Sequence, residues 1–214
     1  MKQNYIHPQR KTKVVFVQLG SPSEPTTKAL RKYLRKFLGD PRVVDINPWL
    51  WKIILNLFVL PFRPKKSAKL YARIWDGNNF PLITHTRDFT KSVSEELKKI
   101  DPKGYVEVNH AFLLSPPYVN EVYDSWEDDL KKGVGATKLL VIPMFPQYSE
   151  STIASGIDAL AKELSKRVKI PTFEVITNFH RTHAFIDNSV NQVDEKLDKL
   201  TKQGKKIDSL IITF

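Results

Sequence analysis

Five short apolar runs recur along the chain, and each is bounded by polar or turn-forming residues. They cover residues 13–19, 106–113, 138–145, 172–177 and 208–213. Several are nearly continuous in Val, Ile, Leu and Phe, a composition typical of strands that are buried on both faces of a parallel sheet. The pattern therefore predicts five strands of a mainly parallel sheet.

Between these runs, apolar residues recur at three- and four-residue spacing, which predicts amphipathic helices. We expect the first helix to begin after Pro25-Thr26 and to end at Gly39-Asp40-Pro41. Further apolar stripes predict helices over residues 89–100, 119–130, 153–164 and 186–200. Strands that alternate with helices of this length indicate βαβ units and a doubly wound α/β sheet.

A long insertion between the first two predicted strands contains the most apolar segment of the chain, residues 49–62. Only Lys52 and Asn56 interrupt it, and their four-residue spacing places both on one face of a helix. The segment is too short to span a bilayer, which needs about 20 apolar residues. It fits either a core helix or a helix lying in a membrane interface. Two tryptophans, the one-sided polar pair and the basic residues within 63–66 favour the interface.

The composition is that of a globular protein, with 41% hydrophobic and 27% charged residues. The lack of cysteine excludes disulfides, thiolate zinc sites and cysteine-ligated iron–sulfur clusters. The N-terminal residues lack the apolar core of a secretory signal, so we expect a cytoplasmic protein. The net charge of +11 raises nucleic acid as a partner. We expect none, because the lysines are spread over the predicted helices and form no basic stripe interleaved with aromatics.

Two strand ends carry candidate chemistry. Gly20 follows the first predicted strand, where a ligand can approach a tight turn, but neither G-x-G-x-x-G nor a Walker lysine motif is present. After the third predicted strand, residues 147–152 supply an amide, a phenol and three hydroxyls at the start of a helix. Capping needs fewer groups than these, and a helix N-terminus also favours a carboxylate. His180 and His183 are one helical turn apart, but no third ligand is evident, so we expect no preformed metal site.

Several segments, taken in order, resemble the ferrochelatases, which insert ferrous iron into a porphyrin to make haem. They are Val-Gln-Leu-Gly-Ser-Pro at 17–22 and the segments at 33–44, 60–75, 144–152 and 179–186. The resemblance implies a chelatase-like pair of Rossmann-like α/β halves with a porphyrin cleft between them. Residues 1–146 would then form the first half, including a membrane-facing lip at 49–62. Residues 147–214 would begin a second half that is left incomplete.

The resemblance also implies which residues meet the porphyrin. Leu19 would face the macrocycle, and Arg63 and Tyr71 would hold a propionate or form the cleft wall. The floor would be lined by Tyr148, Ser149 and Ser151. The substrates would be a porphyrin and Fe²⁺, with no resident cofactor, and residues 49–66 would contact a membrane peripherally. No catalytic or metal-ligating residue of this chain is implied.

The sequence departs from the family in two respects. The metal-handling histidine of the family would directly follow Phe214, and its partner glutamate would lie further on, so we expect residues 1–214 alone to be inactive. We also expect self-association, because the incomplete second half would leave apolar surface and strand edges exposed. Bulky apolar residues at 112–116 and 79–81 replace the family's Arg, Tyr, Gly and Ser, which would narrow the cleft. The alternative hypothesis is therefore a non-catalytic relative that binds a tetrapyrrole or a membrane surface.

Overall fold

The structure is a computed structural model that describes residues 11–133 and 136–211. The chain divides into two compact units, the first ending at Thr177 and the second beginning at Asn178. The boundary at residues 146 and 147 predicted from the sequence falls inside the first unit, and the assignment of 147–214 to a second half stays a prediction.

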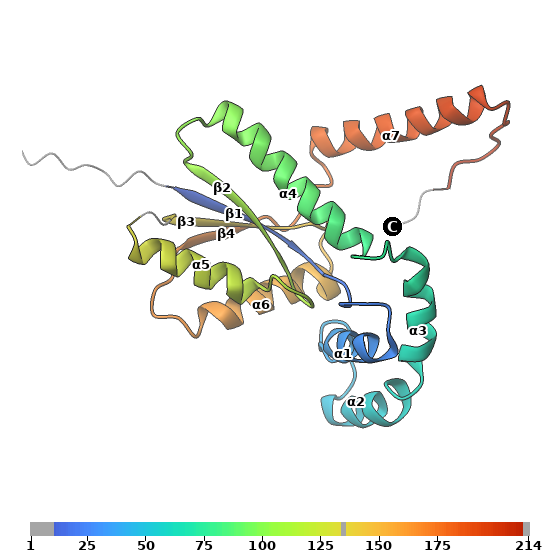
Figure 1. Ribbon diagram of the computed structural model, residues 1–214, viewed down its shortest axis with the longest axis horizontal. Coiled ribbons are helices and arrows are strands. Elements are labelled where there is room, and N and C mark those ends of the chain that lie inside the picture. Colours follow the sequence, from blue (N-terminus) through green and yellow to red (C-terminus); the bar gives the residue numbers. More distant parts are fainter. Residues whose placement is uncertain (1–10, 134–135, 212–214) are drawn as a thin grey trace, which may run out of the picture. The chain divides into compact units, whose positions relative to one another are not determined.

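A four-stranded parallel sheet forms the centre of the first unit (Figure 1). Its strands lie in the order β2-β1-β3-β4. Their bounds are β1 (Thr12–Gln18), β2 (Val106–Phe112), β3 (Lys138–Pro143) and β4 (Thr172–Val175). The predicted parallel α/β architecture is thus confirmed. The strand predicted at 208–213 is not formed over 208–211, and 212–214 lie outside the described residues.

Helices cover both faces of this sheet, which explains why β1 is buried along nearly its whole length. On one face, Val15 and Val17 pack with residues of α5 (Val119–Lys131) and α6 (Ser155–Leu164). On the other face, the ring of Phe16 lies 5.1 Å from that of Phe89 in α4 (Pro81–Ile100). Figure 1 shows α4 on one side of the strands and α5 and α6 on the other. Alternate side chains of one apolar strand therefore enter two different cores.

A second helical cluster lies beyond the carboxyl end of β1 (Figure 1). It contains α1 (Thr27–Leu38), α2 (Pro48–Ile54), the π-helical turn η1 (Leu55–Val59), α3 (Arg63–Tyr71) and the 3₁₀ turn η2 (Ala72–Ile74). Thr26 caps α1 by accepting a hydrogen bond from the N–H of Ala29. Leu30, Leu34 and Leu55 are among the side chains that form the core of this cluster.

The apolar segment 49–62 is amphipathic in the structure. Leu55 and Leu60 are buried in the helical cluster, so the core interpretation holds for these two residues. The other large apolar side chains are mostly exposed: Trp49, Leu50, Ile53, Leu57, Phe58 and Phe62. Within the described residues, no helix is both long enough and apolar enough to cross a membrane. Contact of the exposed side chains with a membrane stays a prediction.

The second unit is built on α7 (His183–Lys202), which begins after the capping residue Thr182. Its apolar stripe was predicted, and Ile186 and Val190 of that stripe are exposed. In the following segment, Leu210 and Ile211 are exposed as well. An apolar face of this kind needs a partner in a stable fold, and self-association through it stays a prediction.

Candidate functional site

The turn after β1 is joined closely to the turn after β2. Gly20 has φ +93°, and a Cβ at this position would lie 2.4 Å from Ser115 Oγ and 3.1 Å from Phe112 Cβ. The N–H of Ser21 donates a hydrogen bond to Ser115 Oγ at 3.3 Å. Only glycine combines this backbone conformation with so close an approach. The predicted role of Gly20 in a tight turn at a strand end is therefore confirmed.

A small cavity of about 110 Å³ lies at this edge of the sheet, and we call it the floor cavity. Among the residues that line it are Leu19, Asp40, Leu113, Leu114, Ser151 and Ser155. Ser155 donates a hydrogen bond to Asp40 at 2.6 Å, which joins α6 to the loop after α1. The fold thus brings together Leu19 and Ser151, two of the residues singled out from the sequence. Leu113 and Leu114 belong to the segment that departs from the family pattern, and they make one wall apolar.

Tyr148 and Ser149 precede the π-helical turn η3 (Glu150–Ala154) and do not line the floor cavity. Tyr148 is half-exposed, and its hydroxyl donates a hydrogen bond to Glu150 Oε1 at 3.3 Å. The Ser149 hydroxyl pairs with the Thr152 hydroxyl and accepts no capping hydrogen bond from a backbone N–H of η3. Capping therefore does not account for the hydroxyl of Ser149.

Arg63 and Tyr71 lie at opposite ends of α3 and have different surroundings. The Arg63 side chain is exposed and makes no hydrogen bond or ion pair with the residues that the structure describes. The ring of Tyr71 packs against Tyr33 at 6.2 Å and against Phe80 at 5.4 Å. Burial, and then the neighbouring Tyr71, raise the pKa of the Tyr33 hydroxyl, so it stays a neutral donor. It lies 3.4 Å from the carbonyl oxygen of Gly20.

A larger cavity of about 300 Å³ lies between α1, the start of α4 and the turn after β2, and we call it the lysine-lined cavity. Its lining includes Ser21, Lys32, Lys36, Trp75, Asn79 and Tyr118. Sequence reasoning missed this site, because Lys32 and Lys36 look like ordinary surface residues of an amphipathic helix. The sequence signal that would have located it is the pair of lysines on either side of Tyr33, which faces the helical core.

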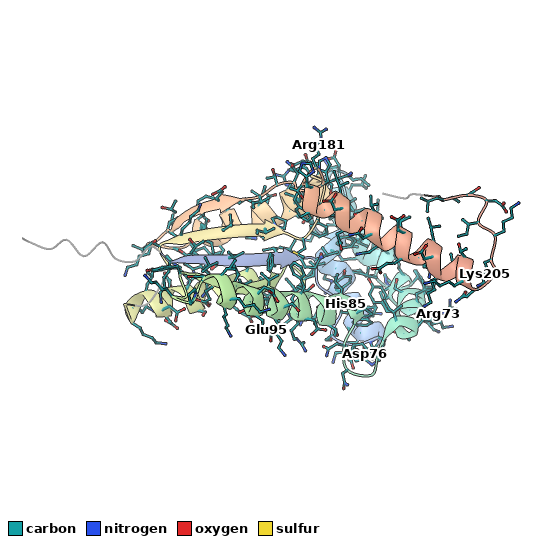
Figure 2. All side chains as sticks on the ribbon, turned by 90° about the horizontal axis from the view of Figure 1, so that it is seen from above. Arg73, Asp76, His85, Glu95, Arg181 and Lys205 are labelled. Carbon is teal, nitrogen blue, oxygen red and sulfur yellow. The ribbon has the colours of Figure 1, made fainter. Side chains whose placement is uncertain are left out.

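The loop that forms one wall of this cavity is ordered by Asp76, which Figure 2 shows on the turn before α4. Its carboxylate accepts hydrogen bonds from the N–H groups of Asn79 at 2.6 Å and Asn78 at 2.8 Å. These bonds lower the pKa of Asp76, since they favour the charged form. The turn presents Asn79 and Phe80 at the cavity.

No group of three or more potential metal ligands occurs within residues 11–133 and 136–211. His183 is the first residue of α7, and His180 lies three residues earlier, so both belong to the second unit. The two strand-end cavities described above belong to the first unit. The lysine-lined cavity is apolar, hydroxylic and basic, whereas the floor cavity is apolar and hydroxylic and contains the carboxylate of Asp40. The surface of the lysine-lined cavity suits an apolar ligand that carries an acidic group, and that of the floor cavity suits an apolar ligand with polar atoms.

Comparison with known proteins shows the family of this chain. A ferrochelatase family model matches residues 11–214. The chain is 40% identical to the ferrochelatase of Idiomarina loihiensis over 196 residues, covering 92% of this chain and 52% of the relative. It is 35% identical to the ferrochelatase of Marinobacter nauticus over 213 residues, covering 99% of this chain and 55% of the relative. It is 36% identical to that of Teredinibacter turnerae, covering 99% and 56%.

The chain spans little more than half the length of these curated relatives. The match nevertheless extends over nearly all of the chain and includes both strand-end turns that form the cavities. The resemblance to the ferrochelatases noted in the sequence is accordingly confirmed. The chain belongs to the ferrochelatase family.

Proposed function

We propose that this chain is the porphyrin-binding part of a ferrochelatase that inserts ferrous iron into protoporphyrin IX. One observation carries the proposal: in a member of this family, Leu19 and Ser151 line the same cavity at the carboxyl end of the parallel sheet. Ligands of open α/β sheets bind at that edge. An apolar side chain beside a hydroxyl suits a flat apolar ring with polar nitrogens.

In this proposal the macrocycle lies against Leu19, with Ser151 beneath it, and the floor cavity is the inner end of a wider cleft. The exposed guanidinium of Arg63 is available for a propionate, and a guanidinium–carboxylate pair is directional and charge-assisted. Binding that bends the macrocycle exposes the nitrogen lone pairs to Fe²⁺, a use of binding energy to strain the substrate. Presenting the metal and accepting the two pyrrole protons require further groups, and we expect them outside residues 1–214.

We also propose that the exposed face of segment 49–62 rests on a membrane. Trp49 and Phe58 are 78% and 65% exposed, and such a cluster of large apolar side chains marks an interaction surface. Lys65 and Lys66 follow it in α3 and are exposed, so cations accompany the apolar face. That combination fits a helix that lies in a lipid headgroup layer, where a hydrophobic porphyrin would be delivered.

A porphyrin titration tests the proposed binding. Protoporphyrin IX is added to the 214-residue protein in detergent micelles, and the Soret band is followed. We expect a saturable shift at micromolar porphyrin, weakened about tenfold or more in Leu19→Glu, because a charge would be buried against the ring. Ile170→Glu is the matched control, since Ile170 is exposed and lines neither cavity. The absence of any shift with the wild-type protein would contradict the proposal.

A second candidate function is tetrapyrrole binding without catalysis. It is favoured by Phe80, Leu113 and Leu114, bulky side chains that take space at the two cavities. A chimera separates the two functions: residues 1–214 are followed by the remainder of the Idiomarina loihiensis relative. Haem formation from Fe²⁺ and protoporphyrin by the chimera supports the enzyme. A Soret shift without haem formation supports the binding protein.

A further inference from the structure

The lysine-lined cavity has an unbalanced positive charge. No Asp or Glu among the described residues lines it. Lys36 Nζ donates a hydrogen bond to the Tyr118 hydroxyl at 2.9 Å and lies 4.4 Å from the centre of that ring, so its charge is partly engaged. Lys32 makes no hydrogen bond or ion pair with any residue within 11–133 and 136–211. One ammonium group is thus uncommitted at the rim of the cavity.

Neutral hydrogen-bonding groups at this cavity are also without partners. The Ser21 side chain is only 6% exposed, and its hydroxyl makes no hydrogen bond to the part of the chain that the structure describes. The side-chain amide of Asn79 is unpaired within the same residues, although its backbone N–H is bound by Asp76. Because these groups are accessible and have no partner among those residues, they are available to a ligand that supplies an acceptor.

The remaining walls are aromatic and apolar. The Trp75 ring packs edge-to-face on Phe80 at 4.7 Å, and both rings line the cavity together with Tyr33. Ile83 and Leu114 add aliphatic surface. The volume of about 300 Å³ lies at the lower end of the range for small-molecule sites, about 300–1,000 Å³. A compact ring system would fit, whereas a macrocycle would not be enclosed.

We propose that the lysine-lined cavity binds a small aromatic monocarboxylate. The ring lies between the aromatic walls, and the carboxylate meets Lys32, the Ser21 hydroxyl and the Asn79 amide. Lys32 supplies an ammonium group that is free to meet an anion, and the aromatic walls favour a carboxylate carried on a ring over inorganic phosphate. The inference does not rest on the proposed porphyrin binding, because the floor cavity shares only Leu114 with this one.

Ligand titration of the 214-residue protein tests the proposal. Benzoate and 1-naphthoate are the probes, and benzamide is the uncharged analogue. Inorganic phosphate represents the competing class of anion. Binding is measured by calorimetry and by saturation-transfer NMR. Lys32→Met removes the charge and keeps most of the stem. Lys28→Met is the matched control, since Lys28 lies one turn earlier on α1 and does not line the cavity. Circular dichroism verifies that both variants fold.

We expect saturable binding of the aromatic carboxylates and much weaker binding of benzamide. Lys32→Met should weaken binding of 1-naphthoate about tenfold or more, because a charge-assisted hydrogen bond is lost, while Lys28→Met leaves it unchanged. Three results would overturn the inference: no saturable binding of either carboxylate, equal affinity in the two lysine variants, or displacement of 1-naphthoate by equimolar phosphate. Failure here leaves the Soret titration unaffected, so the two proposals fail separately.

Discussion

Arg42 connects the loop after α1 to α6 through a bidentate ion pair with Asp158. Its Nε lies 2.6 Å from one carboxylate oxygen and its Nη2 lies 3.1 Å from the other. The remaining Nη1 donates to Glu150 at 2.8 Å. Glu150 begins η3, which also carries Ser151 of the floor cavity. A bidentate guanidinium–carboxylate pair has a defined geometry, so Arg42 positions one side of that cavity.

Arg42→Met should loosen this connection. All three side chains are more than a third exposed, so solvent screens the ion pairs and we expect a decrease in Tm of at most about 3 °C. The difference in Tm between the variant and the wild type should decrease in about 1 M salt, where the Debye length is about 3 Å. Differential scanning calorimetry measures both effects. Lys91→Met is the control, because it breaks only an exposed pair with Glu95 on α4. A salt-independent difference would contradict the electrostatic interpretation.

The same pair predicts a dependence of stability on pH. The hydrogen bonds from Arg42 hold the pKa of the Asp158 carboxyl below its ordinary value. At pH values between the folded and unfolded pKa of Asp158, the unfolded chain binds more protons than the folded chain. The stabilisation that the ion pair gives the folded state is therefore complete above the unfolded pKa, about 4, and is lost as pH falls through the folded pKa. The stability difference between wild type and Arg42→Met should therefore narrow from about pH 6 to about pH 3. Denaturant titrations at the two pH values measure it, and an unchanged difference would contradict the linkage.

Gly20→Ala should destabilise the first unit. The new Cβ would be strained at φ +93° and would collide with Ser115 Oγ. We expect a loss of roughly 2 kcal/mol or more in the free energy of unfolding, measured by denaturant titration. Gly156→Ala is the control, because Gly156 lies in α6 and a Cβ there meets nothing within 4 Å. It should be neutral or stabilise by up to about 1 kcal/mol. Equal effects of the two substitutions would show that the close turn is not required.

Phe80→Ala should cost about 3–5 kcal/mol, the usual range for removing a fully buried Phe. Phe80 is 2% exposed and its ring packs on both Tyr71 and Trp75. Phe80→Leu keeps most of the volume and should cost less than about 1.5 kcal/mol. Denaturant unfolding distinguishes the two variants. A small effect of Phe80→Ala would mean that the aromatic cluster beside the lysine-lined cavity is not a packed core.

Substitution of the exposed apolar residues tests the membrane proposal. Each large side chain buried in the interface contributes about 1.5–3 kcal/mol, so Trp49→Ser with Phe58→Ser should weaken vesicle binding about a hundredfold or more. Sedimentation with anionic lipid vesicles measures the bound fraction. Ile100→Ser is the control, since Ile100 is 79% exposed at the end of α4. If the double variant and the control bind equally, segment 49–62 is not the membrane contact.

Strand and helix placement followed from local patterns, because the period of apolar residues reports which faces are buried. The uninterrupted apolar run of β1 predicted a strand with two covered faces, and the structure has α4 on one and α5 and α6 on the other. The run at 208–213 has the same local character, yet 208–211 form no strand. A strand needs a hydrogen-bonded neighbour, and local composition cannot supply one.

The candidate site was only partly predictable for the same reason. A turn glycine, a hydroxyl-rich helix start and an amphipathic segment are local features, so Gly20, Ser151 and residues 49–62 could be singled out from the sequence. Whether Leu19 meets Ser151, whether Tyr71 faces a cleft or packs against Phe80, and whether Lys32 has an acidic neighbour depend on residues distant along the chain. Burial, partners and cavities are properties of packed surfaces, and only the tertiary structure brings those surfaces together.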